Sequence, residues 1–189
     1  MFRPIPEDKL NNIDPLFPTY KKILHVGTEV ARKDVLTLFK AFYLIKKKYK
    51  NIKLIRVGSR INSHILKSLN LENDVIYIND VDGKRLREIY NLCDLLIFPS
   101  LYEGFGFPGL EAAACGTPVI CSDIPVYKEL YGDSVIYFPV NNHIELAERI
   151  MKFSMNIDRI SSKRGLKLAK ESTWEKVANQ YYNYVMKMS

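Results

Sequence analysis

With 189 residues, 47% of them hydrophobic and 26% charged, the chain suits one globular domain and is too short for two full α/β halves. Its net charge of +7 is spread along the sequence without a nucleic-acid-binding motif, so we expect no nucleic-acid partner. No apolar run is long enough to span a bilayer, no signal peptide is recognisable, and the 3 cysteines lack metal spacing, which predicts a cytoplasmic protein with buried free thiols.

Residues 1–20 contain four prolines and no sustained hydrophobic period. Such a segment is typical of an extended linker. We therefore assign residues 1–20 to a linker and residues 21–189 to one folded domain that includes the C-terminal helix.

Short apolar runs alternate with segments of helical period along the folded part. We expect strands at 23–27, 53–58, 75–78, 94–99, 119–121 and 135–138. We expect helices at 34–49, 84–92, 110–115, 125–131, 142–153, 157–170 and from 173 onward. Because strands that alternate with helices pair in parallel through crossover connections, this order predicts an α/β three-layer sandwich, a six-stranded parallel sheet with helices on both faces.

The stretch 99–123, PSLYEGFGFPGLEAAACGTPVICSD, carries the strongest signal for function. A glycine-bearing loop, 103–109, follows the fourth expected strand, and Pro108 suits the first turn of the next helix. This loop lies at the carboxyl edge of the expected sheet, where open parallel sheets bind ligands. Its amides and the positive end of the helix dipole suit a phosphate or another oxyanion.

Two carboxylates, Glu103 and Glu111, flank this loop. A carboxylate does not bind an anion, but it accepts charge-assisted hydrogen bonds from hydroxyl groups. A diphosphate that joins two polyols, a ribose and a sugar, would satisfy both features.

The same stretch resembles the signature of the retaining glycosyltransferases of family 4, the group 1 type with the two-domain GT-B architecture. Their nucleotide-binding half carries two glutamates at this spacing, followed by A-x-A-C-G-x-P-V-I. The matching residues here are Glu103, Glu111, Ala112, Ala114, Cys115, Gly116, Pro118, Val119 and Ile120. The resemblance implies that residues 21–189 form one Rossmann-like half of a GT-B fold, and that residues 1–20 belong to the connection between its domains.

The resemblance also implies roles for individual residues. Glu111 would hold the ribose hydroxyls, and Glu103 would contact and orient the donor sugar. The loop residues that would contact the sugar and the phosphates are Gly104, Phe105, Gly106 and Phe107. Lys33 occupies the position of a basic residue that the family places after the first strand, and with the adjoining Arg32 it would stabilise the departing diphosphate.

Further donor-binding residues are expected after the first three strands, namely Gly27, Thr28, Gly58 and Val81. The resemblance implies that Val81 lies against the nucleotide base, largely through backbone contacts. Thr28 stands where many family members have arginine, which leaves this chain one cation fewer.

These features predict the donor-binding domain of a retaining glycosyltransferase, which moves a hexose from a UDP-, GDP- or ADP-linked donor to an acceptor hydroxyl. We expect no cofactor and no metal, since protein cations and the helix terminus can meet the phosphate charge. Activity would require a separate N-terminal-type acceptor domain. The positive charge would allow a weak, peripheral association with the inner membrane surface, which suits lipid-linked acceptors.

The alternative is a nucleotide-sugar-binding subunit, or a remnant of a split glycosyltransferase, without activity of its own. Both interpretations use the same residues and differ in whether a partner supplies the acceptor site. A nicotinamide-dependent oxidoreductase fits poorly, because the loop after the first strand has only Gly27 where three spaced glycines are needed.

Overall fold

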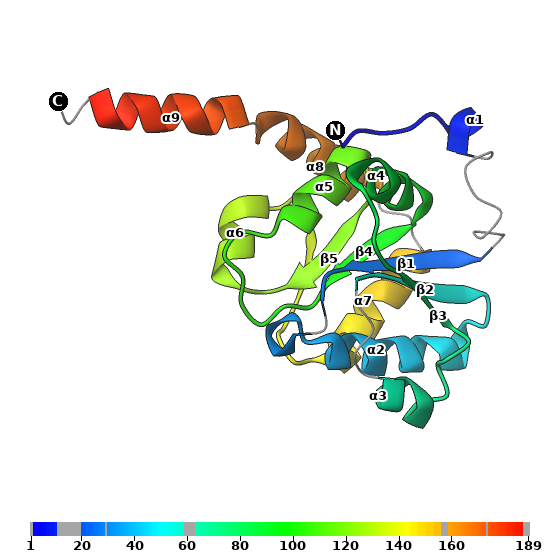
Figure 1. Ribbon diagram of the computed structural model, residues 1–189. Helices are drawn as coiled ribbons and strands as arrows, with labels where there is room; N and C mark the ends of the chain where they lie inside the picture. The colour runs from blue at the N-terminus through cyan, green and yellow to red at the C-terminus, as the bar shows by residue number, and fades with distance from the viewer. Residues whose placement is uncertain are drawn as a thin grey trace.

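A computed structural model of the protein contains one six-stranded sheet with the strand order β3-β2-β1-β4-β5-β6 (Figure 1). The strands are β1 Lys21–Val26, β2 Ile52–Val57, β3 Val75–Ile78, β4 Leu95–Phe98, β5 Val119–Ser122 and β6 Ile136–Phe138. The structure describes residues 2–10, 20–28, 30–58, 63–155, 159–172 and 174–186. Within these residues every strand pairing is parallel, which confirms the predicted sheet.

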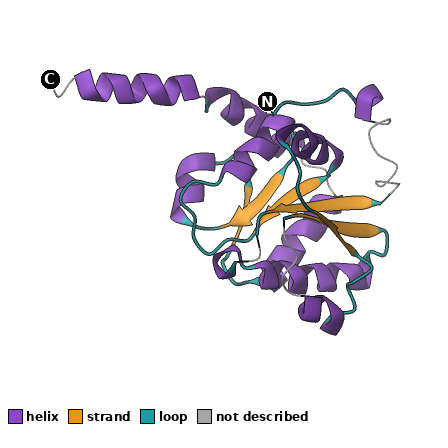
Figure 2. Cartoon of the chain, viewed as in Figure 1, coloured by secondary structure: helices purple, strands orange, loops and turns teal. Residues whose placement is uncertain are grey.

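Helices lie on both faces of the sheet, so the predicted three-layer sandwich is also confirmed (Figure 2). They are α1 Glu7–Leu10, α2 Val35–Lys48, α3 Ser63–Ser68, α4 Gly83–Leu92, α5 Phe107–Cys115, α6 Pro125–Tyr131, α7 His143–Met155, α8 Arg159–Glu171 and α9 Trp174–Met186, with a 3-10 turn, η1, at Ala31–Lys33. Residues of α2, α3 and α7 pack on one face, and residues of α4, α5 and α6 pack on the other. Helix α9 extends away from the sheet (Figure 1).

Strands β2, β4 and β5 are buried on both faces because their side chains are mainly Ile, Leu, Val and Phe. Successive residues point to opposite faces, so Ile23 shares a core cluster with α2 and α7 while Leu24 shares one with α4, α5 and α6. Burying one such side chain contributes about 1.5–3 kcal/mol to folding. Cys93, Cys115 and Cys121 are buried free thiols, as predicted.

Three elements lie where the sequence predicted none: α1, η1 and α3. Each spans fewer than two helical turns, which is too short for the hydrophobic period that marks longer helices. Helix α5 begins at Phe107 rather than at residue 110, because Pro108 lies within its first turn.

The expected linker, residues 1–20, is described in part. It contains α1, and the Phe2 ring packs edge-on against Tyr90 of α4 with the ring centroids 5.6 Å apart. Residues 11–19 lie outside the described part, so the linker role stays a prediction.

The chain reverses its direction across the sheet between β3 and β4. From β1 it moves outward through β2 and β3, and then returns to place β4 on the other side of β1. The loops after β1 and β4 therefore leave the sheet in opposite directions. Open α/β sheets bind ligands at this point of the carboxyl edge.

Candidate functional site

Most of the predicted site residues gather at the carboxyl edge of four neighbouring strands. Gly27 follows β1, Gly58 follows β2, Val81 follows β3, and Glu103 lies in the loop after β4. Gly58 has φ +129°, and a Cβ there would lie 2.5 Å from the Gly27 carbonyl oxygen. Only glycine therefore allows these two loops to approach so closely. Thr28 is exposed beside Gly27, and Val81 is half-buried.

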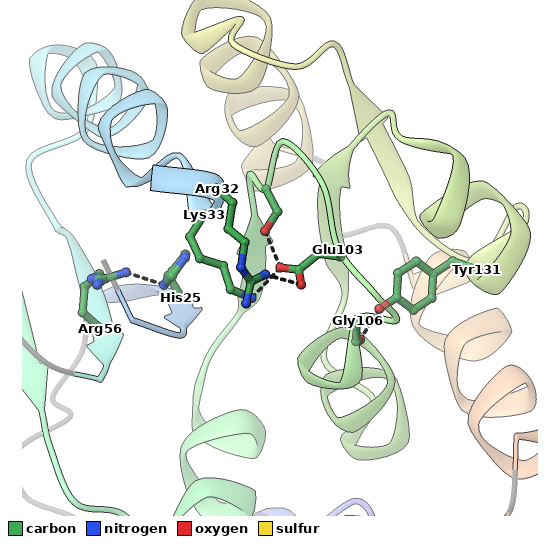
Figure 3. Close-up of polar contacts among 8 residues, drawn as sticks. His25, Arg32, Lys33, Arg56, Glu103, Gly106 and Tyr131 are labelled. Carbon is green, nitrogen blue, oxygen red and sulfur yellow. Dashed lines mark hydrogen bonds and ion pairs between the residues drawn. The ribbon is translucent and has the colours of Figure 1, made fainter. Parts of the chain in front are cut away.

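Glu103 is the centre of a polar cluster that joins the loops after β1 and β4 (Figure 3). Its Oε1 accepts hydrogen bonds from Lys33 Nζ at 2.5 Å and from Ser100 Oγ at 2.8 Å. Its Oε2 accepts one from Arg32 Nη1 at 2.6 Å. The structure thus brings together the three residues predicted to be catalytic. It also pairs Glu103 with both cations, which the sequence analysis did not anticipate.

The charges of this cluster are unequally buried. The side chains of Glu103 and Lys33 are 8% and 10% exposed, whereas that of Arg32 is 38% exposed. Burial acts to raise the pKa of Glu103, but the hydrogen bonds from Lys33 and Ser100, the charge of Lys33 and the hydrogen bond from Arg32 together lower it. Glu103 is therefore ionised at neutral pH, and two cations face one carboxylate.

The amino end of α5 forms the second part of the site. Gly106 is its N-cap residue, with φ +109°. Phe105 and Phe107 flank this glycine; both are exposed, and their ring centroids lie 4.8 Å apart. Gly104 is exposed at the start of the same loop. A helix amino end beside a cluster with excess positive charge suits an anion.

Glu111 lies within α5 and has a different environment from Glu103. Its Oε2 accepts a hydrogen bond from the Tyr90 hydroxyl of α4 at 2.9 Å. Burial raises the pKa of Glu111, and the hydrogen bond from Tyr90 offsets only part of this effect. The two predicted glutamates thus have separate partners and opposite pKa shifts.

Sequence reasoning missed a buried pair beneath the loop after β1. His25 and Arg56 are directly opposite each other on β1 and β2, are fully buried, and share a hydrogen bond between His25 Nδ1 and Arg56 Nη1 (Figure 3). Arg56 Nη2 also donates to the Gly27 carbonyl at 3.4 Å. Burial, followed by the charges of Arg56 and Lys33, holds the pKa of His25 well below its ordinary value, so the imidazole is neutral. The signal available in the sequence was that His25 and Arg56 are polar residues within two mainly apolar strands.

Tyr131 is a second residue that the sequence analysis did not single out. From α6 it donates a hydrogen bond to the Gly106 carbonyl at 2.5 Å, directly at the amino end of α5. No short motif marks such a contact, because it joins residues from two elements that only the fold brings together.

Among the described residues, no group of three or more His, Cys, Asp or Glu side chains is arranged to hold a metal ion. The sequence Asp80-Val81-Asp82 after β3 has the pattern Asp-x-Asp, which could supply two carboxylate ligands to a metal ion. The Asp82 carboxylate, however, accepts the Arg85 N–H at 2.7 Å as the N-cap of α4. Metal independence stays a prediction. In the part of the chain that the structure describes, no helix is both long and apolar enough to cross a membrane.

A surface hollow lies at the opposite, amino-terminal edge of the sheet. It has a volume of about 390 Å³ and is lined by Lys21, Lys48, Tyr49, Lys50, Asn51 and Ile52. None of the predicted site residues contributes to it. The glycine-bearing loops and the helix amino end lie at the carboxyl edge, so we place the candidate site there.

An open parallel sheet with a glycine-bearing loop and a helix amino end at its switch point is typical of α/β domains that bind nucleotides. The family model for glycosyl transferases group 1 matches residues 7–165, and the chain belongs to this family. It is 30% identical over 169 residues to O-antigen chain mannosyltransferase B of Escherichia coli, an alignment that covers 85% of this chain and 44% of that protein.

Solved structures match all or nearly all of this chain, but the match covers only about half of each of those structures. Sucrose-phosphate synthase from Thermosynechococcus elongatus matches with a TM-score of 0.84 and 25% identity, over 100% of this chain and 50% of that one. HepE from Anabaena, solved in complex with UDP and glucose, matches with a TM-score of 0.81 and 17% identity, over 97% of this chain and 53% of that one. The chain thus spans about half the length of each of these three proteins, and its fold is the predicted Rossmann-like half of a GT-B fold.

Proposed function

We propose that this domain binds the nucleoside diphosphate sugar donor of a retaining glycosyltransferase, which moves a hexose to an acceptor hydroxyl. The observation that carries the proposal is the contact of Glu103 with both Lys33 and Arg32 at the carboxyl edge of the sheet. It brings two cations of η1, which follows β1, against a carboxylate in the loop that leads into the amino end of α5.

The diphosphate would lie between the cations and the amino end of α5. Arg32 is the more exposed cation and can turn toward a phosphate, while Lys33 keeps its contact with Glu103. Positive charge held in place before the reaction stabilises the negative charge that develops on the departing diphosphate. These cations and the loop amides would do so without a metal ion or another cofactor.

The two glutamates would bind the two polyol ends of the donor. Glu103 would accept hydrogen bonds from the sugar and orient it, and Glu111 would accept them from the ribose while Tyr90 holds its Oε2. The mannosyltransferase relative makes mannose the first hexose to test. The UDP and glucose bound by HepE support a nucleotide sugar as the ligand, through a likeness of fold.

The acceptor site would come from an N-terminal-type glycosyltransferase domain. That domain, a cytoplasmic location and a weak association with a membrane surface remain predictions. The alternative function, a nucleotide-sugar-binding subunit without activity, would use the same site and would stay inactive with any partner.

A binding screen followed by a transfer assay tests the proposal. The melting temperature of the 189-residue chain would be measured with UDP, GDP, ADP and their sugar conjugates. A ligand at about 100 times its dissociation constant adds about 2.7 kcal/mol of stability. At about 2–4 °C per kcal/mol, the matching nucleotide should raise the melting temperature by several degrees.

The same chain should bind its donor without transferring the sugar. Holding donor and acceptor in reacting geometry contributes up to about 7–11 kcal/mol, and this half of a GT-B fold supplies only the donor side. Turnover at ordinary enzyme rates by the chain alone would refute the half-enzyme proposal. A chain that binds no nucleotide or nucleotide sugar would refute the donor site itself.

A further inference from the structure

Tyr131 reaches from α6 to the amino end of α5 (Figure 3). Tyr131 is 1% exposed, and its hydroxyl donates to the Gly106 carbonyl at 2.5 Å. A Cβ added at Gly106 would lie 2.7 Å from the Tyr131 hydroxyl oxygen, and one added at Gly109 would lie 2.2 Å from it. Two glycines therefore make room for one hydroxyl group at the point where α5 begins.

The hydrogen bond fixes the direction of one peptide group. The Gly106 carbonyl also accepts the Gly109 N–H at 3.1 Å, as expected for an N-cap residue. In a trans peptide the carbonyl and the following N–H point in opposite directions. Holding the Gly106 carbonyl against α6 therefore directs the N–H of Phe107 away from α6, at the amino end of α5.

Helix α6 is anchored by other contacts, so the Tyr131 hydroxyl is not needed to hold it. The Tyr127 ring stacks on Phe98 with the centroids 5.1 Å apart. The single proton of the Tyr137 hydroxyl is shared between the Tyr127 carbonyl at 3.0 Å and the Gly132 carbonyl at 2.8 Å. What the Tyr131 hydroxyl adds is a link from this anchored helix to the loop. Burial raises the pKa of Tyr131, so the hydroxyl keeps the proton that it donates.

We infer that Tyr131 is a positioning residue, which sets the Gly106–Phe107 peptide to face the donor diphosphate without touching the substrate itself. The inference rests on the proposed function, because it needs a diphosphate at the amino end of α5. It assigns to α6 a part in donor binding, although α6 contributes none of the residues proposed to contact the donor.

Tyr131→Phe removes the hydroxyl and keeps the ring. Tyr137→Phe is the matched control, because the Tyr137 hydroxyl of β6 contacts backbone carbonyls of α6 and its C-cap but not the loop before α5, and the stack of Tyr127 on Phe98 still holds α6. Calorimetry would compare the affinity of each variant for the nucleoside diphosphate that stabilises the wild type and for the corresponding nucleoside. Tyr131→Phe should weaken diphosphate binding about three- to tenfold and leave nucleoside binding unchanged. Tyr137→Phe should change neither affinity. A purely structural role would instead lower the melting temperature without changing the ratio of the two affinities.

Gly109→Ala gives a second variant that disturbs the same contact from α5, and its melting temperature would be measured alongside, because a Cβ 2.6 Å from the Tyr131 Cζ requires the ring to shift. It places a methyl group against the same hydroxyl and should cause the same selective loss of diphosphate affinity. Unchanged diphosphate affinity in Tyr131→Phe, or an equal loss for nucleoside and diphosphate, overturns the inference while the proposed function stands. A wild-type chain that binds no nucleoside diphosphate overturns both.

Discussion

Lys33 Nζ and Glu103 Oε1 lie 2.5 Å apart at the carboxyl edge of the sheet, with both side chains almost fully buried. This pair joins the loop after β1 to the loop after β4. It also keeps a cation in the place where we propose that a diphosphate binds. Removing one member of a buried ion pair leaves the other charge uncompensated, so replacing either partner should lower the stability of the fold.

Lys33→Ala should weaken binding of the matching nucleoside diphosphate by about tenfold to a hundredfold. One lost charge-assisted hydrogen bond corresponds to roughly 1.5–3 kcal/mol. Lys53→Ala is a suitable control, because Lys53 pairs with Asp74 at 2.8 Å near the amino ends of β2 and β3. Calorimetric titration should show the loss in the first variant alone; equal affinities for wild type and Lys33→Ala would remove Lys33 from the site.

The two glutamates should affect the pH dependence of stability with opposite signs. The lowered pKa of Glu103 stabilises the fold above the ordinary glutamate pKa of about 4.3, and this contribution is lost as the pH falls through the lowered value. The raised pKa of Glu111 gives a contribution that is present below about 4.3 and is lost as the pH rises through the raised value.

Denaturant unfolding of wild type, Glu103→Gln and Glu111→Gln between about pH 3 and pH 7 measures this difference. The stability advantage of wild type over Glu103→Gln should grow as the pH rises. The corresponding difference for Glu111→Gln should change in the opposite direction. If the stability difference between wild type and variant changed in the same direction with pH for both glutamates, their environments would not be those described above.

Glu111→Ala should weaken binding of the nucleoside diphosphate about tenfold to a hundredfold while sparing inorganic diphosphate, because only the nucleotide has a ribose. Glu103→Ala should instead leave the affinity for the nucleoside diphosphate unchanged. It should reduce the difference in affinity between the nucleoside diphosphate and the nucleoside diphosphate sugar. Competition titrations with the three ligands separate these effects. Unchanged nucleotide affinity in Glu111→Ala would contradict the ribose assignment.

Much of the fold could be predicted because the relevant signals are local. Six apolar runs alternate with amphipathic segments, and the structure contains a strand at each run. Pro108 and Gly116 mark the two ends of α5 within a few residues. The short elements α1, η1 and α3 were missed, since one or two turns do not produce a readable hydrophobic period.

The residues of the candidate site could be named from sequence, but their interactions could not. Glu103, Lys33 and Arg32 were expected at one edge, yet the carboxylate was expected to face a sugar and the cations a diphosphate. Nothing in the sequence shows that Glu103 contacts both cations directly. The contact of Tyr131 with Gly106 and the buried pair of His25 and Arg56 likewise depend on how separate elements meet.

Backbone amide chemical shifts during titration with the matching nucleoside diphosphate would test the central claim most directly. Our account predicts that the largest changes occur at Gly27, Gly58 and the loop of residues 104–107, all at the carboxyl edge of the sheet. Residues that line the hollow at the opposite edge, such as Lys48 and Ile52, should change little. Largest changes at that hollow, with the loop of residues 104–107 unaffected, would contradict the proposed donor site.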